Sequence, residues 1–182
     1  IPASVINYRR GCIAPGTMCT VKEGALAGKV LALFRYYRDG FILSDFSGNY
    51  LLIFDPTTNS WSRFNNEITL TGKASDDEAH LIEIGENRFL MSARTSASGN
   101  RAFAELNISK DGSNLTVNKV TSNLNLKTAC NGTIANFTDE NGNEYMLHSV
   151  PTGNDNGKRT GLDIYTAPKM SSKNNINWTN SF

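Results

Sequence analysis

The sequence predicts an all-β protein, and three observations support this prediction. Helical periodicity is almost absent, since hardly any segment repeats apolar residues every three or four positions. Short apolar or alternating runs recur instead, at a spacing of roughly ten residues. Turn-forming groups such as Arg-Asp-Gly, Ser-Gly-Asn and Glu-Asn-Gly-Asn separate these runs. The pattern is typical of a β-sandwich, a β-barrel or a β-propeller.

The individual runs suit strands because many are rich in β-branched and aromatic residues or alternate between apolar and polar positions. The pairs of runs also come in similar groups, each with a polar opening stretch, two hairpin strands and a turn of the Asp-Gly kind. This rhythm favours a propeller, whose blades contain four short strands each. We predict strands over Lys29–Tyr37, Phe41–Ser44, Tyr50–Phe54, His80–Ile84, Arg88–Ala93, Ala102–Ile108, Leu115–Val120, Gly132–Phe137, Glu144–Val150 and Leu162–Thr166.

Length and charge limit the classes of function. The chain has 182 residues and a net charge of +1, so it is long enough for one domain with a real core. Lys and Arg are scattered, and no basic stripe indicates a nucleic-acid partner or an anionic membrane surface. The longest apolar run, Val30–Phe34, is far too short to span a membrane. The first residue is Ile1 rather than Met, so we expect a processed product or a fragment.

The three cysteines, Cys12, Cys19 and Cys130, define neither a closed disulfide framework nor a metal site. Their number is odd, and no two of them form a C-x-x-C pair. Cys12 and Cys19 either pair in an oxidising compartment or remain free thiols, and the sequence leaves both possibilities open.

Several segments together resemble a known family, the bacterial-type sialidases (exo-α-neuraminidases). Residues 77–94, DEAHLIEIGENRFLMSAR, resemble the family's N-E-x-x-x-V-E-L-x-D-G-x-L-x-x-x-x-R. Ala129–Ile134 is similar to its C-Q-G-S-I, and residues 145–164 resemble its L-L-F-S-N-P…R-x-x-L-x-V segment. The order and spacing of the segments agree over about residues 10–178.

Two further stretches, Ser109–Ser113 and Ser44–Gly48, look like degenerate copies of the family's Asp box, S-x-D-x-G-x-T-W. The resemblance implies an all-β, six-bladed propeller of sialidase type, of which residues 1–182 supply about three central blades. It also implies that these residues form a partial catalytic domain, either a fragment or one chain of a larger enzyme.

The resemblance assigns roles to Glu78, Arg94 and Arg159. Sialic acid carries a carboxylate at its anomeric carbon, and a planar guanidinium binds a carboxylate through two parallel hydrogen bonds. Arg94 and Arg159 match the second and third arginines with which the family holds this group. Sialidases use a tyrosine as the nucleophile, and a phenol needs a neighbouring base to become reactive. Glu78 matches the glutamate that serves as this base.

The implied activity is the retaining hydrolysis of terminal α-linked sialic acids from glycoconjugates, without a cofactor or a metal, by a secreted or cell-surface enzyme. The first arginine, the acid/base aspartate and the nucleophilic tyrosine of the family would lie outside residues 1–182. The chain would therefore need the N- and C-terminal blades as partners, besides its sialylated glycan. Two other functions stay open, a non-catalytic carbohydrate-binding propeller and an intramolecular trans-sialidase.

Each site residue also has an ordinary structural interpretation. Glu78 could be an exposed carboxylate in an acidic turn, and Arg94 and Arg159 could be solvated arginines at strand ends. On an extended segment Asp76, Glu78 and His80 would share one face, as in some metal sites. No second histidine lies nearby, however, and the oxygen spacing does not suit a calcium loop, so we expect no metal here.

Overall fold

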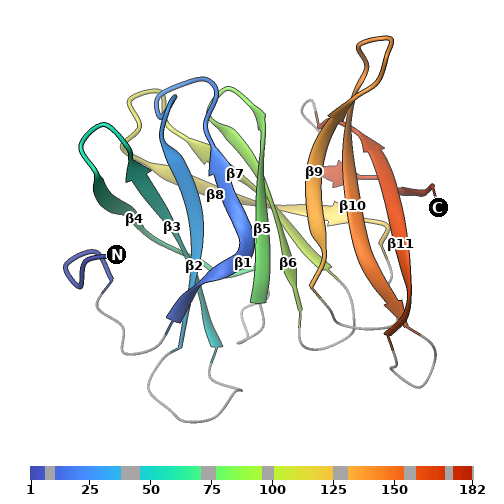
Figure 1. Ribbon diagram of the computed structural model, residues 1–182, viewed down its shortest axis with the longest axis horizontal. Helices are drawn as coiled ribbons and strands as arrows, with labels where there is room; N and C mark the ends of the chain where they lie inside the picture. The colour runs from blue at the N-terminus through green and yellow to red at the C-terminus, as the bar shows by residue number, and fades with distance from the viewer. Residues whose placement is uncertain are drawn as a thin grey trace.

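Three sheets stand side by side in the protein, as seen in a computed structural model that describes residues 1–6, 11–37, 46–70, 77–95, 101–124, 131–153, 159–170 and 174–181 (Figure 1). These residues contain no helix, and therefore none that is long and apolar enough to span a membrane. The first sheet, blade A, is antiparallel, and its strands run in the order β1 (Gly11–Thr20), β2 (Val30–Tyr37), β3 (Phe46–Asp55) and β4 (Ser60–Ile68).

The other two sheets follow the same plan, in which consecutive strands pair, except that a short strand from near the end of the chain completes each of them. Blade B contains β5 (Asp77–Gly85), β6 (Arg88–Arg94), β7 (Arg101–Ile108) and β8 (Leu115–Ser122), and β12 (Asn175–Ile176) joins it in parallel to β8. Blade C contains β9 (Thr133–Thr138), β10 (Glu144–Gly153), β11 (Arg159–Pro168) and β13 (Thr179–Asn180). The first strands of the blades are neighbours, because β5 contacts both β1 and β9. This is the arrangement of propeller blades around a central axis, so the expected fold is confirmed.

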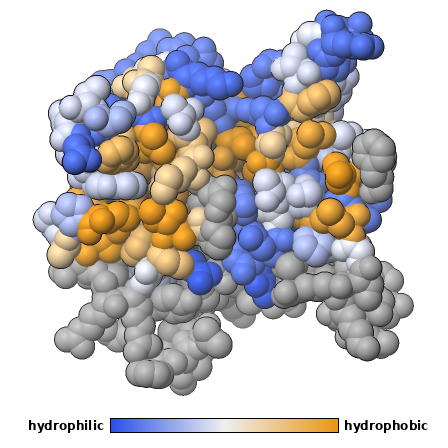
Figure 2. Space-filling model, viewed as in Figure 1, coloured by the Kyte–Doolittle hydropathy of each residue, from blue (hydrophilic) through white to orange (hydrophobic). Residues whose placement is uncertain are grey.

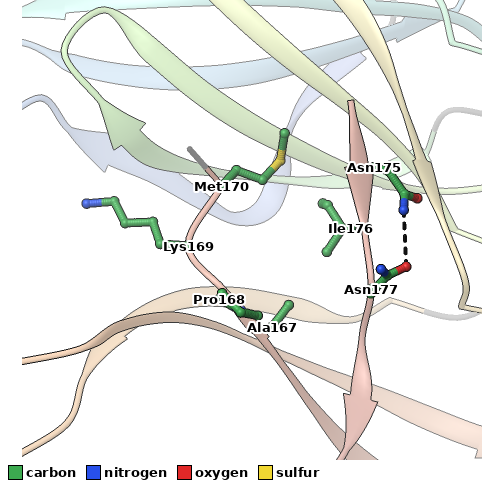
Figure 3. Close-up of a pocket in the computed structure, with 7 residues that line it drawn as sticks. All are labelled: Ala167, Pro168, Lys169, Met170, Asn175, Ile176 and Asn177. Atoms are coloured by element: carbon green, nitrogen blue, oxygen red, sulfur yellow. Dashed lines mark hydrogen bonds between the residues drawn. The ribbon is translucent and has the colours of Figure 1, made fainter. Parts of the chain in front are cut away.

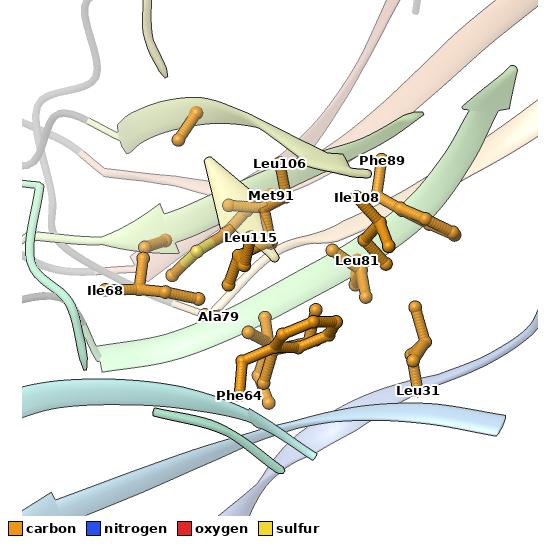
Figure 4. Close-up of a cluster of buried hydrophobic side chains, with 14 of the residues drawn as sticks. Leu31, Phe64, Ile68, Ala79, Leu81, Phe89, Met91, Leu106, Ile108 and Leu115 are labelled. Carbon is orange, nitrogen blue, oxygen red and sulfur yellow. The ribbon is translucent and has the colours of Figure 1, made fainter. Parts of the chain in front are cut away.

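Blade B is buried on both faces, and alternate residues of its strands reach opposite neighbours. On β6, Phe89 and Met91 pack toward blade A, whereas Leu90 packs toward blade C. This double burial explains why β6 reads as a nearly continuous apolar run. Figure 4 shows the core between blades A and B, where Leu31 and Phe64 lie opposite side chains of blade B. The core between blades B and C includes Ile82, Leu90, Phe103, Ile134, Met146 and Trp178.

The two outer faces of the three-blade stack also carry apolar side chains. On blade A, Phe34, Tyr36 and Tyr50 form a third cluster that faces away from blade B. On blade C, Phe137 and Leu162 are strongly exposed, and their register places them on the face away from blade B. Figure 2 shows hydrophobic residues over part of blade A, and hydrophilic residues at the tip of the β9–β10 hairpin.

Four of the described strands were not predicted: β1, β4 and the two-residue strands β12 and β13. The β1 segment contains Pro15 and glycines, and its pairing with β2 is interrupted between Ile13 and Met18. The β4 segment lies at the edge of its sheet and is mostly polar, so it lacks the apolar alternation of a buried strand. The strand predicted over Phe41–Ser44 lies outside the described residues, apart from which every predicted strand is confirmed.

The two expected Asp boxes differ in the structure. Ser109–Ser113 forms the tight turn between β7 and β8, in which the Asp111 carboxylate accepts hydrogen bonds from the Ser109 and Ser113 hydroxyls. These bonds hold the pKa of Asp111 at about 2, below its usual value. The described part of the second stretch, residues 46–48, begins strand β3 instead of forming a turn between strands.

Both described cysteines of the first strand, Cys12 and Cys19, are free thiols.

Candidate functional site

Glu78 lies at the start of β5, in a distortion of the strand. Asp77 pairs with Arg94 and His80 pairs with Ser92, so two residues of β5 stand opposite one residue of β6. This is the pattern of a β-bulge, which bends a strand and redirects a side chain. Glu78 has a backbone φ of 40°, in the left-handed region that only a few non-glycine residues adopt. A strained backbone of this kind is common at functional sites and needs support from its surroundings.

The bulge brings the Glu78 carboxylate to Arg94, the last residue of β6. The Arg94 Nη1 donates a hydrogen bond to Glu78 Oε2 over 2.9 Å. Both side chains remain partly exposed, with 28% of Arg94 and 23% of Glu78 accessible. The pair therefore lies at a surface that a ligand can reach, and a ligand carboxylate could take the place of Glu78 on the guanidinium.

Arg101, the first residue of β7, stands directly opposite Arg94 in the β6–β7 pairing. It is buried, with an exposure of 6%, and its guanidinium bonds to residues of β6 and β5. Its Nε donates to Ser92 Oγ over 3.0 Å, and its Nη2 donates to the Ser92 carbonyl over 3.0 Å. The same Nη2 approaches the Glu78 carbonyl at 3.4 Å. Among the side chains that the structure describes, two guanidinium groups and one carboxylate thus share this end of blade B, an arrangement that suits an anionic ligand.

Ser92 extends this network into blade C through His148. The Ser92 hydroxyl and His148 Nε2 are 2.9 Å apart, and His148 is completely buried between Phe103 and Trp178. Burial lowers the pKa of His148 from 6.5 to about 3, and the nearby Arg101 charge acts in the same direction. His148 is therefore a neutral imidazole at physiological pH, and it ties blade B to blade C without adding charge.

A second contact between these blades involves His80 and Asn131. The His80 Nε2 lies 2.9 Å from Asn131 Oδ1. Burial lowers the pKa of His80, while the hydrogen bond to Asn131 opposes this shift. Gly132, which follows, has a structural reason to be glycine: an added Cβ would lie 2.7 Å from the Ser149 carbonyl oxygen and 2.9 Å from His148 Cε1. The Asn-Gly pair thus lets β9 begin close against β10.

Arg159 begins β11 and pairs with Gly153 at the end of β10. The His80–Asn131 bond joins the start of β5 to the residues just before β9, so blades B and C are aligned in the same direction. Arg159 therefore belongs to the end of blade C that corresponds to the Arg94 end of blade B. The structure describes its backbone position, and its side chain lies outside the description. Asp76, which the alternative metal interpretation used, lies outside the described residues as well.

One pocket of the described residues lies at this end of blade B, where Arg101 lines it together with Leu70, Phe103 and Lys119. No cluster of three or more potential metal ligands occurs among the residues that the structure describes. A shallow pocket lies between β11 and β12, lined by Lys169, Met170, Ile176 and their neighbours (Figure 3). Two of its polar lining residues, Asn175 and Asn177, bond to each other over 3.1 Å. It contains none of the residues that the sequence predicted for the site.

The sequence thus predicted a pair that the structure brings together, Glu78 and Arg94, and missed the groups behind it. Arg101 carried one signal: it is the first residue after the loop that follows Arg94, where a hairpin returns the chain to the same end. Ser92 and His148 carried none, since the two lie 56 residues apart and meet only through the packing of the blades.

Comparisons with known proteins agree with the propeller fold. No family model and no curated protein matches the sequence. A Hadza microbial sialidase is similar in structure, with a TM-score of 0.63 and 14% identity over 87% of this chain and 28% of that one. The NanB sialidase of Streptococcus pneumoniae in complex with 2-[(3-chlorobenzyl)ammonio]ethanesulfonate has a TM-score of 0.64 and 17% identity over 93% of this chain and 23% of its own. A mutant form of NanB gives a TM-score of 0.63 at 15% identity. The chain spans about a quarter of the length of these sialidases, and its fold is that of sialidase-type propeller blades.

Proposed function

We propose that the chain supplies part of the active site of a sialidase, a retaining glycoside hydrolase that removes terminal α-linked sialic acid from glycoconjugates. The observation that carries this proposal is the partly exposed Glu78–Arg94 pair at the end of blade B, held by a bulge with a strained backbone. The sialidase-type fold supports it. The proposed site lies at corresponding ends of blades B and C, where an enzyme could bind a small anion between the two blades.

In the proposed reaction Arg94 and Arg159 hold the carboxylate of the substrate from two adjacent blades. The incoming carboxylate replaces Glu78 as the partner of Arg94, so Glu78 becomes free to accept a proton. Glu78 then takes the proton of a tyrosine contributed by another part of the propeller, and the phenolate oxygen attacks the anomeric carbon. An aspartate, also from outside residues 1–182, protonates the leaving oxygen and later activates water. No step uses a metal or a cofactor.

We further propose that the missing groups arrive with additional blades that pack on the two outer faces of the stack. The cluster around Phe34, Tyr36 and Tyr50 would face the preceding blade, and the face that carries Phe137 and Leu162 would meet the following one. A secreted or cell-surface location would give such an enzyme access to glycoconjugates.

The proposal is tested by substitutions in the full-length protein, with a fluorogenic sialoside as substrate. Arg94→Ala removes a charged clamp and should cost about 3 kcal/mol of transition-state binding, roughly a 150-fold fall in kcat/KM. Glu78→Gln should lower kcat by about 100-fold or more and change KM much less.

The matched controls are Arg88→Ala and Glu105→Gln. Arg88 and Glu105 form an ion pair at the opposite end of the same blade, with Arg88 Nε 2.7 Å from Glu105 Oε1. Both controls should keep kcat close to that of the wild type. Turnover by Arg94→Ala that equals the control would contradict the proposal, and sialoside binding without turnover by the wild type would indicate a non-catalytic binding propeller. Release of an anhydro sugar instead of free sialic acid would indicate an intramolecular trans-sialidase.

A further inference from the structure

We propose that Arg101 is a positioning residue that fixes the Glu78 bulge and ties it to blade C, so that Glu78 and Arg94 keep their relative geometry. The catalytic consequence of this inference rests on the proposed function. The structural part of the inference does not rest on the proposed function, because it concerns only the conformation of Glu78.

The need for such a residue comes from the backbone of Glu78. A φ of 40° on a residue with a long side chain costs free energy relative to an ordinary strand conformation. The regular alternative is available, since β5 and β6 pair in regular register from His80 to Glu83. Contacts around the bulge must therefore favour the distorted form over the regular one.

Arg101 provides contacts of this kind from β7, across the intervening strand β6. Its guanidinium bonds to Ser92 twice, once at the side chain and once at the carbonyl, and this fixes the orientation of the planar group. In that orientation its Nη2 faces the Glu78 carbonyl at 3.4 Å. One rigid group on β7 thereby links β6 to the bulged residue of β5. A lysine has a single ammonium group and cannot make this set of contacts from one position.

The second anchor lies in blade C. Ser92 Oγ accepts the bond from Arg101 Nε, and the same oxygen lies 2.9 Å from Nε2 of the buried His148. His148 belongs to β10, the strand that pairs with β11, and Arg159 begins β11. The network therefore runs from the Glu78 backbone to the sheet that would carry the other carboxylate clamp.

The burial of Arg101 favours a positioning role over direct contact with the substrate. Arg101 has an exposure of 6%, whereas Arg94 opposite it has 28% of its side chain accessible. Arg101 does line a pocket together with Leu70 and Lys119, but its guanidinium already bonds to two strands, so a ligand there would have to replace these bonds to engage it. Arg101 should therefore affect the rate through Glu78 and leave substrate affinity largely unchanged.

The test uses Arg101→Gln and Arg101→Lys in the full-length protein, with Arg88→Gln as a control of equal charge change at the far end of the blade. With a fluorogenic sialoside, Arg101→Gln should lower kcat by about 10- to 100-fold and alter KM by less than about threefold. Arg101→Lys should recover only a small part of the lost rate, and Arg88→Gln should retain wild-type kcat. An unchanged kcat in Arg101→Gln, or a loss that appears mainly in KM, would overturn the inference.

A crystal structure of Arg101→Gln provides a readout that does not depend on activity. We expect the Glu78 φ to become negative and the Glu78–Arg94 hydrogen bond to be lost. A Glu78 with positive φ that still bonds to Arg94 would refute the positioning role. If the wild type does not cleave sialosides, the proposed function fails, and this structural comparison still decides the role of Arg101.

Discussion

The buried His148 makes the stability of the protein depend on pH in a range where few other groups change charge. The folded state binds this imidazole in its neutral form, with a pKa lowered from 6.5 to about 3. The unfolded state leaves the imidazole in water, where it takes up a proton as the pH falls below 6.5. The stabilisation is therefore complete above pH 6.5 and is lost progressively as the pH falls toward 3.

The change in the free energy of unfolding follows from the difference between the pKa of His148 in the unfolded state and its pKa in the folded state. Between about pH 7.5 and about pH 5 the unfolded chain gains nearly one proton at this site, which costs the folded state about 2 kcal/mol. His80 shifts in the same direction because it is also buried. Some carboxylates, among them Asp111 and Asp139, have pKa values lowered from their normal 3.8. They stabilise the folded state at neutral pH and lose this effect only as the pH falls below 3.8, so they do not obscure the change between about pH 7.5 and about pH 5.

The assay is urea-induced unfolding at both pH values, for the wild type and for His148→Gln. Glutamine keeps an amide that can bond to Ser92 and does not titrate, so His148→Gln should lose about 2 kcal/mol less than the wild type on acidification. The difference between the two proteins cancels the contribution of all other groups. Equal losses in both proteins, or an NMR signal of His148 that titrates near pH 6, would refute the reasoning.

Other predictions concern the packing of the blades. Gly132→Ala should destabilise the protein by about 1–3 kcal/mol, because its Cβ would overlap the Ser149 carbonyl, and a lowered melting temperature would reveal this. Gly142→Ala, which meets no atom but has a φ of 83°, should cost only about 1 kcal/mol. Leu90→Ala and Met91→Ala should each cost about 2–5 kcal/mol. Hydrogen exchange should rise mainly in blade C for the first and in blade A for the second, and a uniform rise in both would contradict the assignment of their interfaces.

How much of the fold the sequence predicts depends on how a strand is buried. Strand β6 was predicted because both of its faces pack against neighbours, which makes its apolar character obvious. Strand β4 was missed because an edge strand can be polar and still complete its ladder of backbone hydrogen bonds. Strand β1 was missed because its Pro15 and glycines resemble loop residues when the partner strand is not known.

The sequence likewise predicts only some features of the candidate site. Glu78 and Arg94 lie on consecutive strands, so a family-like spacing within one hairpin was enough to predict both as site residues. The bulge at Glu78 has no sequence signal, because the residue is neither glycine nor asparagine. The contact between Ser92 and His148 depends on how two blades pack, which local patterns do not reveal.

The pairing of β12 with β8 has a consequence for the order of folding during synthesis. Residues 77–122 can form their hairpins as soon as they leave the ribosome, yet the outer edge of β8 waits for Ile176, which is made 54 residues after its partner Ser122. At common rates of translation this delay lasts roughly 3 to 11 seconds. Trp178, which packs on Phe103 and His148, arrives at the same time. Blade B therefore begins to form early and is completed only when β12 has been made, and a nascent chain stalled before residue 175 would leave the edge of β8 exposed to aggregation.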